Sequence, residues 1–486
     1  MNEKPTRRQC LWTGLMALGG FALPAPGAPP QKPNILFIVV DDLRPELACY
    51  GRDWIKSPNI DRLARQGMTF DRAYCQQAVC SPSRSSLLTG TRPDTTRVWD
   101  LVTHFRDALP NVVTLPQHFK QHGYFVQGMG KIYHPGLEDE RSWSVPWQTA
   151  NAPTYAKLKT PDVKDDDKPS KGKDGPAFES AGVPDNFYKD GMVADLAVST
   201  LRDLARKSEP FFFAVGFSKP HLPFVAPRKY WDLYDPAKIQ LAPNPYHPKD
   251  APEYALAGTS ELRNYVGIPK EGPMPEPLAR QLKHGYYASV SYTDAQIGKV
   301  LAELDRLGLT KNTIIVLWGD HGWKLGEHGE WAKHTNVEND TNAPLLLSVP
   351  GMKNAGAHSS ALVEFVDVYP TLSELAGLPL PGHLEGASFK PLLDNPSRPW
   401  KSAAFSQYPR GQKLMGYSMR TDRYRFTVWL GRQDHSHVDA VELYDHVTDP
   451  QENVNIAKLP ANAELVHGLM EQWRLGWKGA TPPAVR

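Results

Sequence analysis

The sequence predicts an α/β fold: a large mixed, mostly parallel sheet sandwiched by helices, followed by a smaller C-terminal α+β domain on an antiparallel sheet. Three observations predict it. The chain has 486 residues, 41% hydrophobic and 22% charged, which is enough for a large packed core. Short continuous apolar runs alternate with segments of helical periodicity. After about residue 385, short segments instead alternate apolar and polar residues, as in strands with one exposed face.

The first quarter of the chain contains two predicted strands and two predicted helices. Residues 34–40 are a continuous apolar run, typical of a strand buried on both faces. A helix is predicted to begin at residues 57–59, where Ser-Pro-Asn precedes apolar residues at helical spacing. Residues 114–122 are predicted to form a helix that ends at Gly123, and a strand follows through 124–126.

The middle of the chain repeats this alternation of helices and strands. Residues 190–207 form an amphipathic pattern with apolar side chains on one face, which predicts a helix. It leads directly into residues 210–215, an aromatic-rich run that is predicted to be a buried strand. A long helix is predicted at 280–307, and two further strands at 313–318 and 344–349.

A last helix of this part is predicted at 366–376, where Gly377 ends it. Strands that alternate with helices imply a mostly parallel sheet that is covered on both faces.

Two loop regions interrupt the pattern. Residues 157–180 are rich in Lys, Asp, Pro and Gly, and residues 242–279 are rich in Pro and polar groups. We expect both to be solvated surface insertions, and either could border a substrate cleft.

The C-terminal part has the pattern of a separate, smaller sheet. Residues 417–420 and 424–429 alternate in polarity like antiparallel strands, and a closing helix is predicted at about 460–476. The predicted organisation is an N-terminal segment at 1–27, a main domain at 28–384 and a C-terminal antiparallel-sheet subdomain at 385–486.

The N-terminal segment has the layout of an export signal. Arg7 and Arg8 precede an apolar stretch at 11–23, and small residues with prolines follow, including Ala25 and Gly27. The paired arginines suggest the twin-arginine route, and cleavage is expected after Gly27. The apolar stretch is shorter than the roughly 20 residues that a membrane span needs. We therefore expect a periplasmic or secreted bacterial protein without stable membrane insertion.

Charge and cysteine content narrow the classes of partner and chemistry. The chain carries 55 basic and 53 acidic residues, a net charge of +2, which gives no reason to expect nucleic acid as a partner. Cys10 lies in the export signal, so the mature chain has Cys49, Cys75 and Cys80. If Cys80 is used in chemistry, Cys49 and Cys75 remain as a pair whose bonding the sequence leaves open.

Polar clusters follow three of the predicted strands. Asp41-Asp42 follows residues 34–40, Ser218-Lys219-Pro220-His221 follows 210–215, and Asp320-His321 follows 313–318. In a parallel sheet, ligands bind at the carboxyl ends of the strands. The three clusters are therefore expected to meet at one site.

One short motif identifies a candidate nucleophile. Cys80-Ser81-Pro82-Ser83-Arg84, with Leu88-Thr89-Gly90 after it, resembles the signature of the formylglycine-dependent sulfatases. In that family a maturation enzyme converts the cysteine of C-x-P-x-R into a formylglycine aldehyde. Other stretches resemble the family in order and spacing: 41–42, 130–134, 219–221, 319–322 and 327–333. The segments 76–80, 92–97 and 326–331 resemble the iduronate-2-sulfatase branch most closely.

The resemblance covers about residues 33 to 456 and implies an alkaline-phosphatase-like fold, with 28–384 as the catalytic sulfatase domain. It also implies a metal site. Its ligands would be Asp41, Asp42, Cys80 in modified form, Asp320 and His321. Oxygen-rich clusters favour a hard ion, so Ca²⁺ is expected, with Mg²⁺ and Mn²⁺ as less favoured alternatives. His321 is the unusual member, because an imidazole is a poorer Ca²⁺ ligand than an amide oxygen.

The same resemblance implies a catalytic set. It consists of Cys80, Arg84, Lys131, His134, His221, Asp320 and Lys333. Hydrolysis of a sulfate monoester needs positive charge at the sulfuryl oxygens, a strong nucleophile and a proton donor for the leaving oxygen. By the family pattern, Asp320 takes the proton of the attacking hydroxyl, His221 protonates the leaving oxygen and His134 accepts a later proton. The two histidines could exchange these roles without changing the residue set.

Substrate contacts are expected from Lys131, Lys333 and His221 together with neighbouring residues. Arg97, His104 and Trp323 could line the substrate pocket, although Trp323 could equally be a core residue and Arg97 a structural ion-pair partner. A carboxylated sugar would require a further cation, for which Arg97 or Arg106 is the candidate.

The predicted function is hydrolysis of sulfate esters on an oligo- or polysaccharide, with a 2-O-sulfated uronic acid as the expected sugar by resemblance. Two other functions stay open. One is a phosphonate monoester or phosphodiester hydrolase of the same superfamily, although the ligand set resembles a single-ion site rather than a two-ion one. The other is a non-catalytic binder of sulfated glycans. The presence of the complete catalytic set favours an enzyme.

Overall fold

The computed structural model of this protein describes residues 1–2, 32–156, 175–257 and 261–482. The predicted export signal at 1–27 lies outside the described residues, apart from the first two. Residues Pro33–Arg486 form one unit, which contains every helix and strand found in the described residues. In the described part of the chain, no helix is both long enough and apolar enough to span a bilayer.

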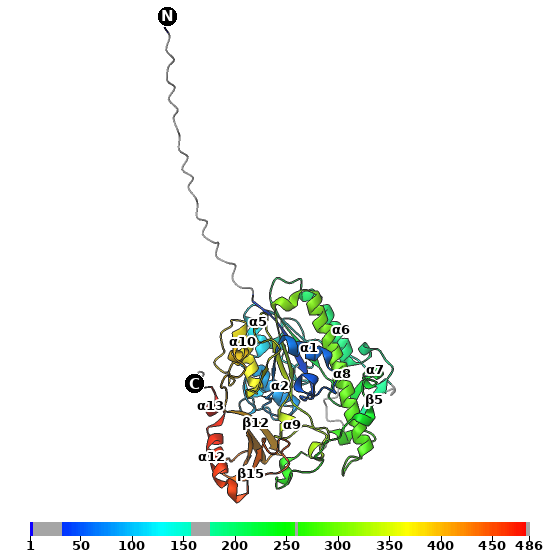
Figure 1. The fold of residues 1–486 in the computed structure, drawn as a ribbon, viewed down its shortest axis with the longest axis vertical. Coiled ribbons are helices and arrows are strands. Elements are labelled where there is room, and N and C mark those ends of the chain that lie inside the picture. Colours follow the sequence, from blue (N-terminus) through cyan, green and yellow to red (C-terminus); the bar gives the residue numbers. More distant parts are fainter. Residues whose placement is uncertain (3–31, 157–174, 258–260, 483–486) are drawn as a thin grey trace. The chain divides into compact units, whose positions relative to one another are not determined.

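A seven-stranded sheet forms the centre of this unit (Figure 1). Its strands, in spatial order, are β10 (His358–Ser359), β2 (Met68–Phe70), β9 (Leu345–Ser348), β8 (Thr313–Gly319), β1 (Asn34–Val40), β6 (Phe211–Phe217) and β4 (Phe125–Gly130). β9 runs antiparallel to β2 and β8, and the other neighbours are parallel. This confirms the predicted mixed, mostly parallel sheet.

Strand β1 shows how the sheet is buried on both faces. All of its residues are buried, and successive side chains point to opposite sides. Leu36, Ile38 and Val40 join the core against helices α1 (Pro58–Gln66), α6 (Lys189–Leu204) and α8 (Glu276–Arg306). Ile35, Phe37 and Val39 join the core against α2 (Cys80–Thr89), α5 (Leu115–Gln121) and α10 (Val368–Leu375). Figure 1 shows the two groups of helices on either side of the sheet.

Shorter elements complete this part of the fold. The short helices are α3 (Pro93–Thr96), α4 (Phe105–Ala108), α7 (Arg228–Trp231), α9 (Glu338–Thr341) and α11 (Lys390–Asp394). Two small parallel pairs are β3 (Ala73–Tyr74) with β11 (Val363–Glu364), and β5 (Phe178–Ala181) with β7 (Phe224–Pro227). The long helices agree with the prediction, except that α8 begins four residues earlier than expected.

The C-terminal sheet is antiparallel, as predicted. It consists of β12 (Ala403–Arg410), β13 (Leu414–Thr421), β14 (Tyr424–Gly431) and β15 (Val438–Asp445). Helices α12 (Ala463–Arg474) and α13 (Gly476–Ala480) follow it, and Leu469 and Ala480 pack on the apolar side of the sheet. The boundary between residues 384 and 385 stays a prediction.

The structure corrects the expectation for the segment 242–279 and answers the question that the sequence left open for Cys49 and Cys75. The segment 242–279 is not simply a solvated insertion, because Leu262, Tyr265 and Ile268 are buried in the main core. Of the other insertion, residues 157–174 lie outside the described part, and β5 follows them. Cys49 and Cys75 are both free thiols, so this pair forms no disulfide.

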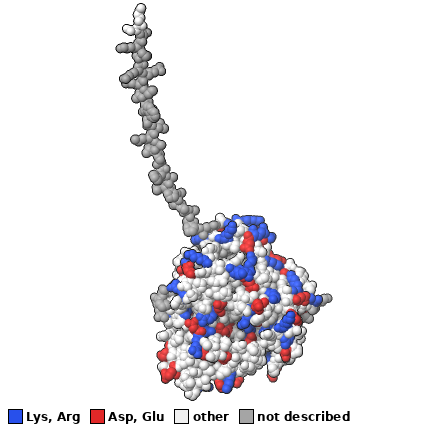
Figure 2. Space-filling model, viewed as in Figure 1, with Lys and Arg blue, Asp and Glu red and all other residues white. Residues whose placement is uncertain are grey.

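Figure 2 shows basic and acidic side chains interspersed on the viewed face, as expected from the near-neutral charge balance.

Candidate active site

The polar residues after three central strands meet at one edge of the sheet. Val40 at the end of β1 is level with Gly319 of β8 and with Phe217 of β6, so the three strands end together. Two backbone hydrogen bonds continue this register: Asp41 N–H donates to the Phe217 carbonyl, and Asp320 N–H donates to the Val40 carbonyl, each at 3.1 Å. The parallel register therefore brings the three predicted clusters together.

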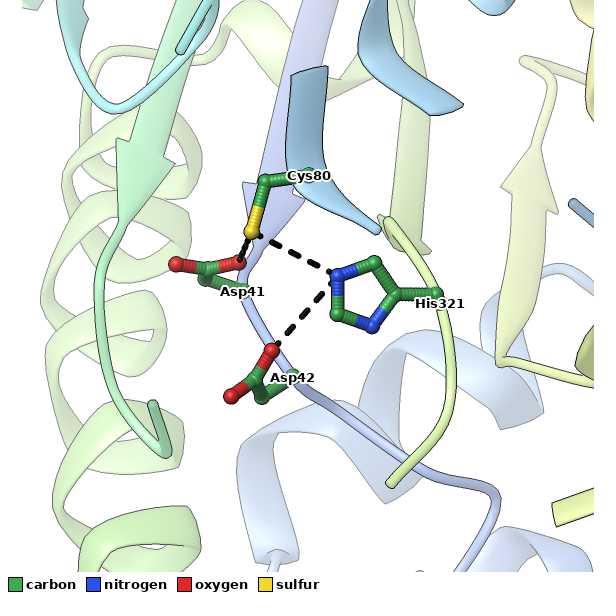
Figure 3. A group of neighbouring side chains, drawn as sticks. All are labelled: Asp41, Asp42, Cys80 and His321. Carbon is green, nitrogen blue, oxygen red and sulfur yellow. Dashed lines mark hydrogen bonds and ion pairs between the residues drawn. The ribbon is translucent and has the colours of Figure 1, made fainter. Parts of the chain in front are cut away.

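Cys80 lies at the first position of α2 and points into this cluster (Figure 3). Its Sγ atom is 3.3 Å from Asp41 Oδ1 and 3.5 Å from His321 Nε2. His321 Nε2 is in turn 3.5 Å from Asp42 Oδ1 and 3.6 Å from Asp320 Oδ2. All of these residues are buried, so their charges act on one another through little solvent.

Local backbone geometry fixes two of the approaches to the site. Asp42 has a left-handed conformation (φ 56°), which Asp tolerates better than most residues, and its N–H donates to Asp320 Oδ1 at 3.1 Å. Gly130 ends β4 at φ 69°, and a Cβ there would collide with the carbonyl oxygen of Gly216 on β6. Glycine is therefore required where the chain turns to present Lys131.

Three buried cations surround the carboxylates. Arg84, on α2, donates from Nε to Asp320 Oδ2 at 2.9 Å and lies 3.4 Å from Asp41 Oδ1. Lys131 Nζ lies 2.7 Å from Asp41 Oδ2. Lys333 Nζ donates to both Asp42 oxygens, at 2.9 and 3.1 Å. The Lys and Arg residues of the predicted catalytic set are thus in contact with the predicted metal ligands.

The carboxylates differ in how well their charge is compensated. Burial alone would raise the pKa of Asp41, but Lys131, with help from His221, Arg84 and Lys333, holds it well below the usual value. The pKa of Asp42 is raised well above its usual value by burial, which outweighs Lys333. Burial, with the charge of Asp41, raises the pKa of Asp320 to about 7. The pocket therefore holds more carboxylate charge than its cations balance.

This charge imbalance provides a test of the metal site. Asp41, Asp42, Cys80 and His321 present ligand atoms within 4.8 Å of one another, and Asp320 adjoins them. Carboxylates whose pKa is raised by burial and mutual repulsion favour the binding of a cation, which would stabilise their ionised forms. The donor set is rich in oxygen apart from one ring nitrogen and the atom carried by residue 80. The residues therefore fit a hard divalent cation.

Of the two predicted histidines, His221 borders this cluster, with Nε2 4.0 Å from Asp42 Oδ2. The ring of His221 lies between the carbonyl of Leu222, 2.6 Å from Nδ1, and a carboxylate oxygen of Glu261, 3.2 Å from Nε2. Burial and then the charge of Lys333 hold the pKa of His221 well below its usual value. His134 is buried in the segment that follows β4, three residues after Lys131.

Glu261 is a site residue that the sequence analysis missed. Its second carboxylate oxygen lies 3.1 Å from Lys333 Nζ, so Glu261 bridges Lys333 and His221. It belongs to the segment 242–279, which the sequence predicts to be a surface insertion. No motif marks it, because its role depends only on where the fold places that segment.

The predicted substrate contacts differ in their surroundings. Trp323 is a core residue whose ring lies against Phe224, and Lys333 Nζ is 4.9 Å from its ring centre. It therefore supports Lys333 from within the core. His104 stacks on Phe105 and caps α4 through Nδ1, which accepts a hydrogen bond from the Arg106 N–H.

The two arginines considered for a sugar carboxylate are placed very differently. Arg106 is engaged by both oxygens of Asp139, at 2.6 and 2.7 Å, so it is a structural ion-pair partner. Arg97 is exposed and stacks on Trp99, with its guanidinium 5.7 Å from the ring centre. Arg432, at the end of β14, lies 5.0 Å from the same ring. Of the two candidates, Arg97 is the exposed one, and Arg106 is held by a carboxylate.

Comparisons with known proteins agree with this geometry. A family model described as Sulfatase matches residues 33–378, and one described as N-sulphoglucosamine sulphohydrolase, C-terminal, matches residues 326–475. Iduronate 2-sulfatase of Mus musculus is 37% identical, with 90% of this chain and 93% of the relative covered. Iduronate 2-sulfatase of Homo sapiens is 35% identical, with 96% and 99% covered.

Solved structures share the fold at lower sequence identity. The structure of BT4656 in complex with its substrate D-glucosamine-2-N,6-O-disulfate has a TM-score of 0.75 at 24% identity, over 93% of this chain and 98% of that one. Phosphonate monoester hydrolase from Silicibacter pomeroyi has a TM-score of 0.73 at 23% identity, over 93% and 96%. Both likenesses concern the fold alone.

Proposed function

Because this chain belongs to the sulfatase family, in the iduronate-2-sulfatase-like branch, and is a sulfuric ester hydrolase, we propose that it removes sulfate from a glycan. The expected sugar is a 2-O-sulfated uronic acid. One observation carries the proposal: Cys80 begins a buried helix beside three carboxylates, His321 and three buried cations. The positive side chains of this cluster suit a tetrahedral anion held against residue 80.

The nucleophile is the formylglycine made from Cys80 by a maturation enzyme. The unmodified thiol is poorly suited to the role, because burial and then the nearby charge of Asp41 raise its pKa well above the usual value. A hydrated aldehyde would instead offer two hydroxyls on one carbon, one to attack sulfur and one to expel the sulfate later. Cys80 Sγ marks the position that the attacking hydroxyl oxygen would take.

The cation is Ca²⁺ in this proposal, with Mg²⁺ and Mn²⁺ as less favoured alternatives. Asp41, Asp42, Asp320 and His321 would hold it, together with an oxygen of modified residue 80. When bound, it would supply positive charge that lowers the pKa of the hydroxyl and polarises the sulfate.

The remaining residues bind the anion and move protons. Lys131 and Lys333 hold the sulfuryl oxygens as point charges, and Arg84 fixes the start of α2 against Asp320. Asp320 takes the proton of the attacking hydroxyl, His221 protonates the leaving oxygen, and His134 accepts the proton when sulfate is expelled. His221 Nε2 lies 4.0 Å from Asp42 Oδ2 and 3.2 Å from Glu261 Oε1. This position beside a proposed metal ligand supports a role for His221 in proton transfer to the leaving oxygen.

Substrate recognition extends beyond the sulfate pocket in this proposal. Arg97 would bind the sugar carboxylate, since it is exposed and, among the described residues, has the Trp99 ring rather than a carboxylate as its neighbour. His104 would lie near it. Export to the periplasm or the medium, through the signal at 1–27, would bring the enzyme to such polysaccharides.

The test begins with mass spectrometry of the tryptic peptide Ala73–Arg84, from protein produced with its maturation system. A mass of the aldehyde or its hydrate at residue 80 is expected. The mature protein should then hydrolyse an aryl sulfate and a 2-O-sulfated uronate disaccharide, and the Cys80→Ala variant should hydrolyse neither. An aryl phosphonate monoester is the comparison substrate. Preference for it over the sulfate would favour the phosphonate hydrolase, and binding without turnover by fully modified protein would favour a non-catalytic binder.

A further inference from the structure

Glu261 is a fixed anion inside the pocket that is proposed to hold sulfate. It directly precedes a short helical turn, Leu262–Asn264, whose Leu262 is buried in the main core, as is Tyr265. Its carboxylate spans Lys333 Nζ at 3.1 Å and His221 Nε2 at 3.2 Å, and the side chain is 16% exposed. The core contacts of Leu262 and Tyr265 fix the chain directly after Glu261.

Lys333 is therefore paired with two carboxylates when no substrate is bound. Asp42 lies on one side of its amine and Glu261 on the other. A sulfuryl oxygen that approaches Lys333 must share it with Glu261. Among the described residues, the ion pairs of this cluster join three cations, Arg84, Lys131 and Lys333, to four carboxylates, Asp41, Asp42, Asp320 and Glu261. A bound divalent cation would attract a doubly charged anion more strongly than a singly charged one, and the charge of Glu261 opposes that preference.

The anions that compete for this pocket differ in charge more than in shape. A sulfate monoester carries one negative charge, and a phosphate monoester carries two above its second pKa of about 6. Hydrolysis of the sulfate ester breaks its S–O bond, adds water and releases inorganic sulfate, which carries two charges after it loses its proton. A carboxylate a few ångströms away repels the doubly charged anions more strongly, by about tenfold or more in affinity for one extra charge.

We propose that Glu261 makes the sulfate pocket select by charge: it admits singly charged tetrahedral esters, and it disfavours phosphate monoesters and the doubly charged sulfate product. This inference rests on the proposed function of the same pocket. Glu261 thus acts as a specificity-determining residue that also favours product release, while Lys333 and His221 act on the ester itself.

The test uses Glu261→Gln, which keeps the shape of the side chain and removes its charge. Three ligands separate charge from element: phenyl sulfate (singly charged), phenyl phosphate at pH 8 (doubly charged) and a singly charged phenyl phosphonate monoester. Their affinities are measured by calorimetry in a Cys80→Ala background, which prevents turnover. We expect the affinity for phosphate relative to sulfate to rise about tenfold, and that for the phosphonate monoester relative to sulfate to stay unchanged.

The matched control is Glu253→Gln. Glu253 is an exposed residue of the same segment, so the substitution changes net charge equally and should leave all three affinities unchanged. A second readout is product inhibition of the mature enzyme, where Glu261→Gln should lower the inhibition constant of inorganic sulfate about tenfold while that of Glu253→Gln stays at the wild-type value.

The outcomes separate the possible failures. Equal changes for all three ligands in Glu261→Gln would mean that Glu261 only supports the pocket, and the proposal would be overturned. If Glu261→Gln does not fold, Glu261→Ala takes its place with the same expected ratios. A wild-type protein that binds neither phenyl sulfate nor the phosphonate monoester would instead defeat the proposed function. The charge proposal alone fails if phenyl sulfate binds well but Glu261→Gln leaves the affinity for phenyl phosphate relative to phenyl sulfate unchanged.

Discussion

Two clusters of acids and histidine among the described residues look alike in geometry but differ in charge balance. Each places at least three candidate ligand groups within 4.8 Å of one another: Asp41, Asp42, Cys80 and His321 in the pocket, and Glu338, His446 and Glu452 in the second cluster. The second cluster joins α9 to the C-terminal sheet. Proximity alone therefore does not identify the functional site.

Arginines make the difference in the second cluster. Arg425 pairs with Glu452 and with Glu338, at 2.5 Å each, and Arg420 pairs with Glu338 at 3.1 Å. Burial alone would raise the pKa of Glu338, but Arg425 and Arg420 hold it at about 2, and Arg425 likewise keeps the pKa of Glu452 low. In the catalytic pocket, the pKa values of Asp42 and Asp320 are raised instead. Carboxylates that are paired with arginines serve the fold, and breaking such a pair is costly. Carboxylates whose charge the nearby cations do not balance favour the binding of a metal ion.

The largest effect is expected from Asp42→Asn. Activity should fall by at least about a hundredfold and bound metal should be lost, because even residues behind metal ligands contribute that much to affinity or rate. In metal-free protein this substitution should cost less stability than Glu452→Gln does, since burial already disfavours the charge of Asp42 and raises its pKa. Metal content, sulfatase activity and urea unfolding of chelator-treated protein provide the measurements. A large loss of stability without loss of metal would reverse our distinction between the clusters.

Glu452→Gln should show the opposite pattern. Removing one partner of a fully buried ion pair leaves Arg425 with Glu338 as its one paired carboxylate among the described residues, so the free energy of unfolding should fall by up to about 3–5 kcal/mol. Metal content should stay at the wild-type value. Glu471→Gln is the control, because its pair with Arg474 is exposed and should contribute less than about 1 kcal/mol. Bound metal that disappears with Glu452 would mean that the second cluster holds an ion after all.

The two clusters should also respond oppositely to pH. The folded-state pKa of Glu338, about 2, is below its usual 4.5, so its stabilising contribution of about 3 kcal/mol is present above pH 4.5 and disappears as pH falls towards 2. The pKa of Asp320 is raised to about 7 from 3.8, so in metal-free protein its contribution to stability declines as pH rises from 3.8 to 7. Urea unfolding from pH 7 to pH 3 measures both. Glu338→Gln should flatten the acid limb, and added metal should restore stability near pH 7.

The smallest effect is expected at the exposed residue Arg97, which belongs to neither cluster. Arg97→Ala should raise KM for a sulfated uronate by up to about fivefold, the usual size of an exposed charged contact, and leave the hydrolysis of an aryl sulfate without a carboxylate unchanged. Lys413→Ala is the control, because it removes another exposed positive charge, in the turn between β12 and β13. Equal losses on both substrates would mean that Arg97 supports the fold instead of contacting the sugar.

Much of the fold could be predicted because its signals are local. The run at 34–40 and the amphipathic pattern at 190–207 depend on residues within a few positions of one another, and both became the expected elements. The cluster around Cys80 could also be anticipated, since strand ends of a parallel sheet lie at one edge and the C-x-P-x-R motif is contiguous. The position of Glu261 could not, because it depends on how a long irregular segment packs back onto the core.

The sequence by itself determined the class of fold, and it predicted Cys80 as the nucleophile with the acidic residues around it, because periodicity and contiguous motifs encode them. Only the tertiary structure decided which charges are compensated. It paired Arg106 with Asp139, placed Trp323 beneath Lys333, and set Glu261 against Lys333 and His221. Electrostatic partners come from distant segments brought together by packing, and burial decides how strongly they interact. No local pattern carries that information.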